Sequence, residues 1–153
     1  MSNPHVLRLA EPLPLECGGQ LAEVQIAYHT YGTLNAAGDN VVWVCHALTA
    51  NSDVLGWWPG LFGAGDYFDP ADWFIVCANV LGSCYGSTGP LTPAAPSNKP
   101  LYAAFPQLTV RDLIAAHEQL RQHLGLDKIH TVIGGSLGGQ QAVEWAIAQP
   151  AVF

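Results

Sequence analysis

A serine between glycines is the residue of this chain best suited to nucleophilic chemistry. Residues 134–139 read Gly-Gly-Ser-Leu-Gly-Gly, after an apolar run and before a helix-like segment. A strand, a sharp turn and a helix in this order form a nucleophile elbow, which presents the serine hydroxyl at the carboxyl edge of a sheet. Larger side chains two residues before or after the serine would collide, so Gly134 and Gly138 are expected to be required. We predict that Ser136 is a catalytic nucleophile.

A phosphate-binding turn is the competing interpretation of these glycines. The segment has no Lys-Ser/Thr pair of the kind that ends a P-loop, and its glycines are not spaced as GxGxxG. We therefore favour the elbow.

A serine nucleophile needs hydrogen-bond donors for the oxyanion that forms during acyl transfer. One donor is the N–H of the residue after the serine, here Leu137, and the other comes from a loop after an earlier strand. The apolar run Val41–Cys45 continues into His-Ala-Leu-Thr-Ala-Asn-Ser, a loop in the expected place. We predict that Leu48 supplies the second donor through its N–H.

The general base is not expected within these residues. After an elbow the other triad members follow in the order Asp, His, whereas all six histidines here precede Ser136. We therefore interpret His46 as a structural residue that shapes its loop. Glu144 is also expected to be structural, and Arg111 and Arg121 are expected to be surface charges.

Three continuous apolar runs have the length of strands, namely Val41–Cys45 and residues 73–80 and 129–133. Strands that are apolar at every position are typical of a parallel sheet buried on both faces. Nearer the N-terminus, residues 21–31 contain an alternating stretch preceded by Gly18-Gly19, which predicts a hairpin-like unit.

Two helices are predicted after these strands. Thr109 can cap the first, with Asp112 at the third helical position, and Gly125 is placed to end it. The second covers residues 137–149 and stops before Pro150. Strands and helices in alternation predict an α/β fold with a mostly parallel sheet and a right-handed crossover.

Residues 82–106 contain five prolines and no periodicity. A loop of this length is usually functional, and its position after a strand favours a site-lining loop over a plain surface loop. We interpret Trp57-Trp58 as packing and loop rigidity rather than substrate contact.

The chain has 153 residues, a net charge of −7 and only 11% charged residues. This balance argues against a nucleic-acid partner and against an anionic membrane surface. No apolar run is long enough to span a bilayer and no secretory leader is visible, so a cytoplasmic location is expected. The four cysteines form no CxxC pair and are expected to be buried, reduced thiols, with no metal role.

Three segments in register carry a family resemblance: residues 46–49 (HALT), 79–90 (NVLGSCYGSTGP) and 134–146 (GGSLGGQQAVEWA). They resemble the homoserine O-acetyltransferases, α/β-hydrolase-fold acyltransferases of methionine biosynthesis, and the likeness runs from about residue 10 to the end. Family members commonly carry Gly in place of Ala50, and Met in place of Leu137 or Gln141. A main-chain N–H donor is unaffected by such changes.

The resemblance implies a ping-pong reaction. Ser136 would accept an acetyl group from acetyl-CoA, the oxyanion would be held by Leu48 and Leu137, and the hydroxyl of L-homoserine would then attack. Acetyl-CoA would be a co-substrate, with no cofactor and no metal. A downstream His oriented by a downstream Asp would be the base, a substrate-binding arginine would also lie downstream, and a helical lid would mediate a homodimer.

Members of this family are well over twice as long as this chain. Residues 1–153 are therefore interpreted as the N-terminal portion of a single α/β-hydrolase domain, without its lid, its catalytic Asp and His or its C-terminal strands. Triad members act as a unit, so the isolated chain is expected to be inactive or nearly so. Homoserine-dependent release of CoA that Ser136→Ala abolishes would contradict this.

Other functions remain open at this point. A serine ester hydrolase of the same fold would differ only in its acceptor, water. An O-succinyltransferase would share the elbow, and serine is a possible acceptor in place of homoserine. The chain could also be a non-catalytic remnant that serves as a binding module.

Overall fold

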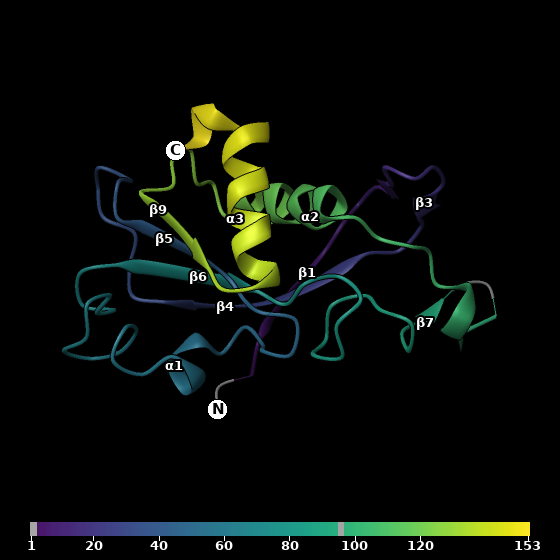
Figure 1. The fold of residues 1–153 in the computed structure, drawn as a ribbon, viewed down its shortest axis with the longest axis horizontal. Coiled ribbons are helices and arrows are strands. Elements are labelled where there is room, and N and C mark those ends of the chain that lie inside the picture. The colour runs from purple at the N-terminus through teal and green to yellow at the C-terminus, as the bar shows by residue number, and fades with distance from the viewer. Residues whose placement is uncertain (1–2, 95–96) are drawn as a thin grey trace.

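A five-stranded mixed sheet forms the centre of the structure, a computed structural model that describes residues 3–94 and 97–153 (Figure 1). The strands lie in the order β1-β4-β6-β5-β9. Their bounds are β1 His5–Arg8, β4 Gln25–Tyr31, β5 Val41–Cys45, β6 Phe74–Ala78 and β9 Thr131–Gly134. β5 runs parallel to both β6 and β9, whereas β4 is antiparallel to β1 and to β6. The predicted α/β class with mostly parallel strands is confirmed.

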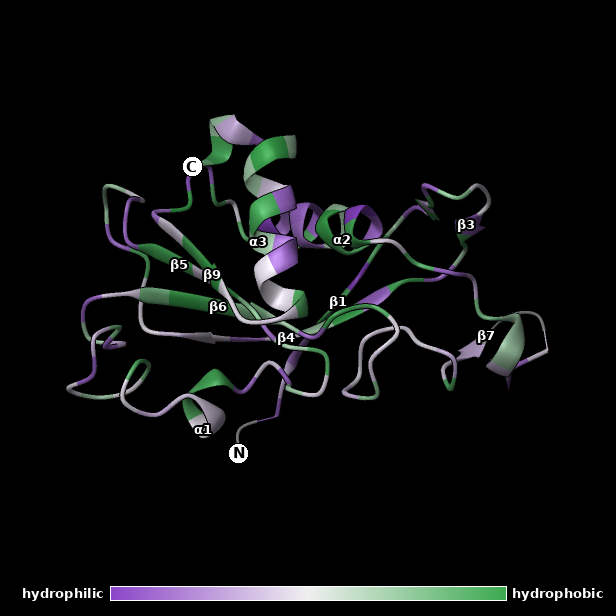
Figure 2. Cartoon of the chain, in the orientation of Figure 1, coloured by the Kyte–Doolittle hydropathy of each residue, from purple (hydrophilic) through white to green (hydrophobic). Residues whose placement is uncertain are grey.

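Strand β5 is buried on both faces, as its uninterrupted apolar sequence predicts. Val41, Trp43 and Cys45 belong to the core beneath the two long helices. Val42 and Val44 belong to a second core on the opposite face. Figure 2 shows the strong hydrophobic colour of β5 and β6 at the centre of the fold. Since successive side chains of a strand point to opposite faces, covering both faces requires an apolar residue at every position.

Two strands differ from the predicted bounds. β6 ends at Ala78, two residues before the end of the predicted run. Asn79 N–H still bonds to Ala27 O of β4, but Val80 N–H bonds to the side chain of His46 instead of a strand. β9 begins at Thr131, two residues later than predicted, because the N–H of Ile129 bonds to Val152 O instead of a strand. β9 also ends one residue later than predicted, at Gly134.

Helix α2 (Val110–His123) crosses from β6 to β9 over one face of the sheet, and α3 (Leu137–Ala148) packs beside it (Figure 1). The predicted capping box is present: Thr109 Oγ1 accepts from Asp112 N–H, and Asp112 Oδ2 accepts from Thr109 N–H. Gly125 adopts a φ of +66° just after the helix, which suits a glycine stop.

The opposite face is covered by α1 (Val54–Trp57) and the aromatic loops around it. The Trp57 and Trp58 rings stack 5.2 Å apart, and Trp57 Nε1 donates to Asn51 O at 2.8 Å, in keeping with a packing role. The N-terminal hairpin is β2 with β3, which flank Gly18-Gly19. The remaining short elements have these bounds: β2 Leu13–Pro14, β3 Gln20–Leu21, β7 Pro93–Ala94, β8 Lys99–Pro100, and the 3-10 turns Tyr102–Ala104 and Pro150–Val152.

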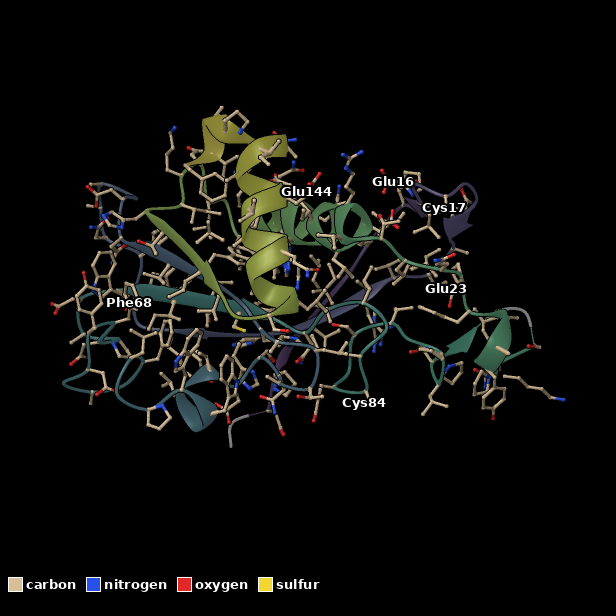
Figure 3. The ribbon with its side chains drawn as sticks, in the orientation of Figure 1. Glu16, Cys17, Glu23, Phe68, Cys84 and Glu144 are labelled. Carbon is tan, nitrogen blue, oxygen red and sulfur yellow. The ribbon has the colours of Figure 1, made fainter. Side chains whose placement is uncertain are left out.

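Arg111 and Arg121, both predicted to be surface charges, form ion pairs with other residues of the chain. Arg111 is exposed, as predicted, but pairs with Glu16 at 2.8 Å and with Glu144 at 2.7 Å; Figure 3 labels these two glutamates. Arg121 is not a surface charge, because its side chain is only 14% exposed and bonds to Glu118 and to Leu126 O. Buried carbonyl and carboxylate oxygens therefore hold this guanidinium in place.

The cysteine prediction is wrong for two of the four residues. Cys45 and Cys77 are buried in the strands, whereas Cys17 and Cys84 are exposed. Cys17 precedes the hairpin turn and Cys84 lies on the loop after β6, so both lie outside the central sheet (Figure 3). Within residues 3–94 and 97–153, no helix combines the length and apolar character needed to cross a membrane.

Candidate active site

The predicted site residues lie where three parallel strands end. Parallel neighbours bring their carboxyl ends to one edge of a sheet, and ligands of open α/β sheets bind at such an edge. The loop after β5 (residues 46–52, here the Leu48 loop), the loop after β6 and the turn after β9 all start from this edge. A cavity of about 670 Å³ opens at this edge of the sheet. Its lining is mainly apolar and includes Leu48 and Leu137.

Ser136 stands in a strained turn between β9 and α3. Its φ of +54° and ψ of −122° lie in a region that residues with a β-carbon rarely adopt, at a cost of about 1–3 kcal/mol. The residue is exposed, so its hydroxyl is open to a ligand. The strand, turn and helix of the predicted elbow are therefore formed around this serine.

The glycines two positions from Ser136 lie against the end of β5 as well as against each other. A β-carbon on Gly134 would stand 2.6 Å from Cys45 O, and one on Gly138 would stand 2.6 Å from Cys45 C. Neither site can hold a side chain without moving main-chain atoms. A β-carbon on Gly135 would meet nothing within 4 Å, so only the alternate glycines are sterically required.

Two residues that line this cavity have main-chain N–H groups without partners among the described residues. Among the described residues neither Leu48 N–H nor Leu137 N–H makes a hydrogen bond. Leu137 is the first residue of α3, where the N–H groups are unpaired and the helix dipole is positive. Two unpaired donors on the wall of one cavity, beside an exposed serine, can bind a developing oxyanion.

His46 is a structural residue, as the sequence argument predicts. Its side chain is fully buried; Nδ1 donates to Ala47 O at 2.7 Å, and Nε2 accepts from Val80 N–H at 3.1 Å. Burial lowers the pKa of His46, which favours the neutral form that these two bonds need. With both ring nitrogens occupied, His46 ties the Leu48 loop to the end of β6.

A second polar contact at the same place was missed by the sequence argument. Asn79, the residue after β6, is 3% exposed and its side chain bonds to Ser52 at the far end of the Leu48 loop. Ser52 Oγ also hydrogen-bonds to His29 Nδ1 at 2.8 Å. The available signal was the position of Asn79, a polar residue directly after a buried strand and the first residue of the 79–90 motif.

The proline-rich loop after β6 lines the cavity in its described part. Residues 82–85, Pro90, Phe105 and Pro106 form part of the wall, as predicted for a site-lining loop. Ser87 Oγ accepts from Ala27 N–H and Thr88 Oγ1 accepts from Gln25 N–H, so this part of the loop is fixed along β4. Residues 95 and 96 of the predicted loop lie outside the described residues.

Among the described residues, no candidate base contacts Ser136, the predicted nucleophile. Among them, no hydrogen bond joins the Ser136 hydroxyl to a histidine or carboxylate, and no cluster of three or more potential metal ligands is present. Acyl transfer by Ser136 therefore needs a proton acceptor from outside the part of the chain that the structure describes.

Residues 40–151 match a family model described as the alpha/beta hydrolase fold. The chain is 54% identical over 140 residues to a homoserine O-acetyltransferase of Chlorobaculum parvum, a match that covers 92% of this chain and 39% of that protein. The chain thus spans about two-fifths of the length of such curated relatives.

Solved structures show the same architecture. The homoserine O-acetyltransferase of Bacillus anthracis superposes with a TM-score of 0.86 at 29% identity, over 98% of this chain and 44% of that one. The esterase E22 superposes with a TM-score of 0.90 at 27% identity, over 99% of this chain and 45% of that one. The sheet edge and its three loops are therefore shared by proteins that are named as transferases and as esterases.

Proposed function

The chain belongs to the alpha/beta hydrolase fold family, and we propose that the protein containing it transfers an acetyl group from acetyl-CoA to the hydroxyl of L-homoserine. The observation that carries this proposal is Ser136, held in a strained turn directly before Leu137, which lines one cavity together with Leu48 and, like it, has an unpaired N–H among the described residues. The 54% identity to a homoserine O-acetyltransferase supports homoserine as the acceptor.

In the first half-reaction, Ser136 Oγ attacks the thioester carbonyl of acetyl-CoA and gives its proton to a histidine base. That histidine, and an Asp that orients it, would come from residues downstream of this chain. The N–H groups of Leu48 and Leu137 hold the oxyanion of the tetrahedral intermediate. Its collapse breaks the C–S bond, and the CoA thiolate leaves with the proton, so that an acetyl-serine remains.

In the second half-reaction, the hydroxyl of homoserine attacks the acetyl-serine carbonyl while the same base accepts its proton. The oxyanion again lies against the two N–H groups, and the bond to Ser136 Oγ breaks as that oxygen regains a proton. The products are O-acetylhomoserine and free enzyme. Since both halves pass through an oxyanion at one carbonyl, one pair of donors serves the whole cycle.

The likeness to proteins named as homoserine O-acetyltransferases supports an acetyl donor over a succinyl donor. As further parts of this proposal, acetyl-CoA is a co-substrate and no bound cofactor takes part. The complete enzyme is a cytoplasmic homodimer, and the 153 residues alone are inactive or nearly so.

An ester hydrolase is the second candidate, since the esterase E22 superposes with a TM-score of 0.90. The two functions differ in whether homoserine or water discharges the acetyl-serine. The deciding experiment supplies acetyl-CoA to the protein that contains this chain with its downstream residues, and follows release of the CoA thiol with and without homoserine. We expect homoserine to accelerate release and Ser136→Ala to abolish it. Release at one rate with or without homoserine would favour the hydrolase.

A further inference from the structure

The two ends of the Leu48 loop are tied to the end of β6 by side chains that take no part in the mechanism above. At one end, His46 Nε2 accepts from Val80 N–H at 3.1 Å. At the other, Asn79 makes two bonds to Ser52: Oδ1 accepts from Ser52 N–H at 2.7 Å, and Nδ2 donates to Ser52 Oγ at 2.8 Å. Leu48 lies between these anchors with its side chain largely exposed.

The side chain, the N–H and the carbonyl of Asn79 all make hydrogen bonds, which makes this residue a rigid anchor. Its Nδ2 also donates to Tyr85 O at 2.8 Å, and its N–H donates to Ala27 O at 2.8 Å. Its own carbonyl accepts from Ser87 Oγ. The side chain thus joins the Leu48 loop to the loop after β6, and both loops line the cavity. A primary amide is the side chain of this size that offers both an acceptor and two donors.

We propose that Asn79 is a positioning residue of the oxyanion hole, which fixes the direction of Leu48 N–H through Ser52. The inference rests on the proposed function, because it assigns Leu48 as an oxyanion donor. The loop contains one internal main-chain bond, from Ala50 N–H to Ala47 O. Between its ends it is otherwise held by Trp57 Nε1 on Asn51 O and Tyr85 OH on Thr49 O, so the buried bonds at its two ends contribute much of its placement. Displacing a catalytic group by about 1 Å can lower a rate about 100-fold without loss of substrate binding.

Asn79→Asp provides the test, because aspartate keeps the size and the acceptor for Ser52 N–H but has no N–H for Ser52 Oγ or Tyr85 O. The matched control is Thr88→Val, which removes the Oγ1 bonds from the same loop to Gln25 N–H and Glu23 O and touches neither Asn79 nor the Leu48 loop. In the complete enzyme we expect Asn79→Asp to lower kcat about 10- to 100-fold, with KM for homoserine within about twofold. Thr88→Val should change kcat by less than about twofold.

A second variant and a second readout keep the test decisive if Asn79→Asp folds poorly. Ser52→Ala removes the Oγ bonds to Asn79 and to His29 but keeps the bond from Ser52 N–H to Asn79 Oδ1, and it should lower kcat about 3- to 10-fold, again with KM unchanged. Hydrogen exchange followed by mass spectrometry should show faster exchange of residues 46–52 than in wild type in both variants, but not in Thr88→Val. This measurement does not depend on which acceptor the enzyme uses.

The outcomes separate this inference from the proposed function. An active wild type in which Asn79→Asp and Thr88→Val have equal kcat, or in which the loss lies only in KM, would overturn the inference and leave the function standing. A wild type that ignores homoserine but hydrolyses p-nitrophenyl acetate through Ser136 would refute the proposed function. The same kcat comparison on the ester would then decide the inference, since the oxyanion hole serves both reactions.

Discussion

Gly138, in the first turn of α3, lies directly against Cys45, the last residue of β5. A β-carbon at Gly138 would overlap the Cys45 carbonyl group, 2.6 Å from its carbon atom. This contact sets how closely the helix that begins after Ser136 approaches the central strand. It therefore also sets where Leu137 N–H, in the same turn, meets the cavity.

Gly138→Ala is expected to destabilise the fold by several kcal/mol, because main-chain atoms of β5 or α3 must move to admit the methyl group. Gly135→Ala is the matched control, since a β-carbon there would stand in open space and the φ of Gly135 is not in the left-handed region. Chemical denaturation of the two variants measures the difference. Equal stabilities would show that the helix does not depend on this close approach.

Ser136→Gly and Ser136→Ala should both abolish acyl transfer but differ in stability. Alanine keeps the β-carbon and so keeps the strain at a φ of +54°, whereas glycine removes it. Relief of about 1–3 kcal/mol, less about 1 kcal/mol for the more flexible unfolded chain, should leave Ser136→Gly more stable than Ser136→Ala by about 1 kcal/mol. An alanine variant at least as stable as the glycine variant would contradict a strained turn.

Stability is expected to fall as the pH drops below about 6.5, because of His117. Burial lowers the pKa of His117 to about 4, and its Nε2 bonds to Gln141 Oε1 at 2.9 Å. The unfolded chain therefore binds a proton more readily than the folded one, and stability is lost as the pH falls from about 6.5 towards 4. Between pH 7 and pH 5 this should amount to about 2 kcal/mol.

Urea unfolding at the two pH values checks this, with His117→Gln as the comparison. Burial also lowers the pKa of His46, which adds a loss of the same sign in both proteins. The drop in the variant should therefore be about 2 kcal/mol smaller than in wild type. If wild type and variant lose the same stability between the two pH values, groups other than His117 cause the pH dependence.

In the folded protein, two of the four thiols should react with an alkylating reagent and two should not. Iodoacetamide is expected to alkylate the exposed Cys17 and Cys84 and to spare Cys45 and Cys77, which are buried and whose pKa values burial raises. Peptide mass spectrometry before and after unfolding reads this out. Rapid alkylation of either buried thiol in native protein would refute the packing of β5 and β6.

Cys84 also lines the cavity, so a bulky maleimide there should block acyl transfer. Cys84→Ser should make the enzyme resistant to the reagent, whereas Cys17→Ser should leave it sensitive. A wild type that keeps full activity with Cys84 labelled would mean that this thiol is remote from the bound substrates.

Patterns that are local in sequence predicted the parts of the fold that local physics decides. The apolar run Val41–Cys45 predicted a strand buried on both faces, and Thr109 with Asp112 predicted the start of α2. The glycines around Ser136 likewise predicted a turn that the structure forms. In each case the cause lies within a few neighbouring residues.

Features that depend on distant segments were not predictable in this way. The bonds between Asn79 and Ser52 join residues 27 positions apart, and the start of β9 is set by a bond from Ile129 to Val152 O. The burial of Arg121 depends on how Glu118 and the chain after α2 fold around it. None of these partners can be chosen from spacing alone, because many polar residues lie at similar separations.

The fate of an acetyl group on Ser136 tests the proposed reaction most directly. The protein that contains this chain with its downstream residues is mixed with acetyl-CoA alone, quenched, and digested for peptide mass spectrometry; homoserine is added to a parallel sample before the quench. We predict one acetyl group on Ser136 without homoserine, and its loss, with formation of O-acetylhomoserine, when homoserine is present. An acetyl group on another residue, or one on Ser136 that homoserine does not remove, would contradict this mechanism.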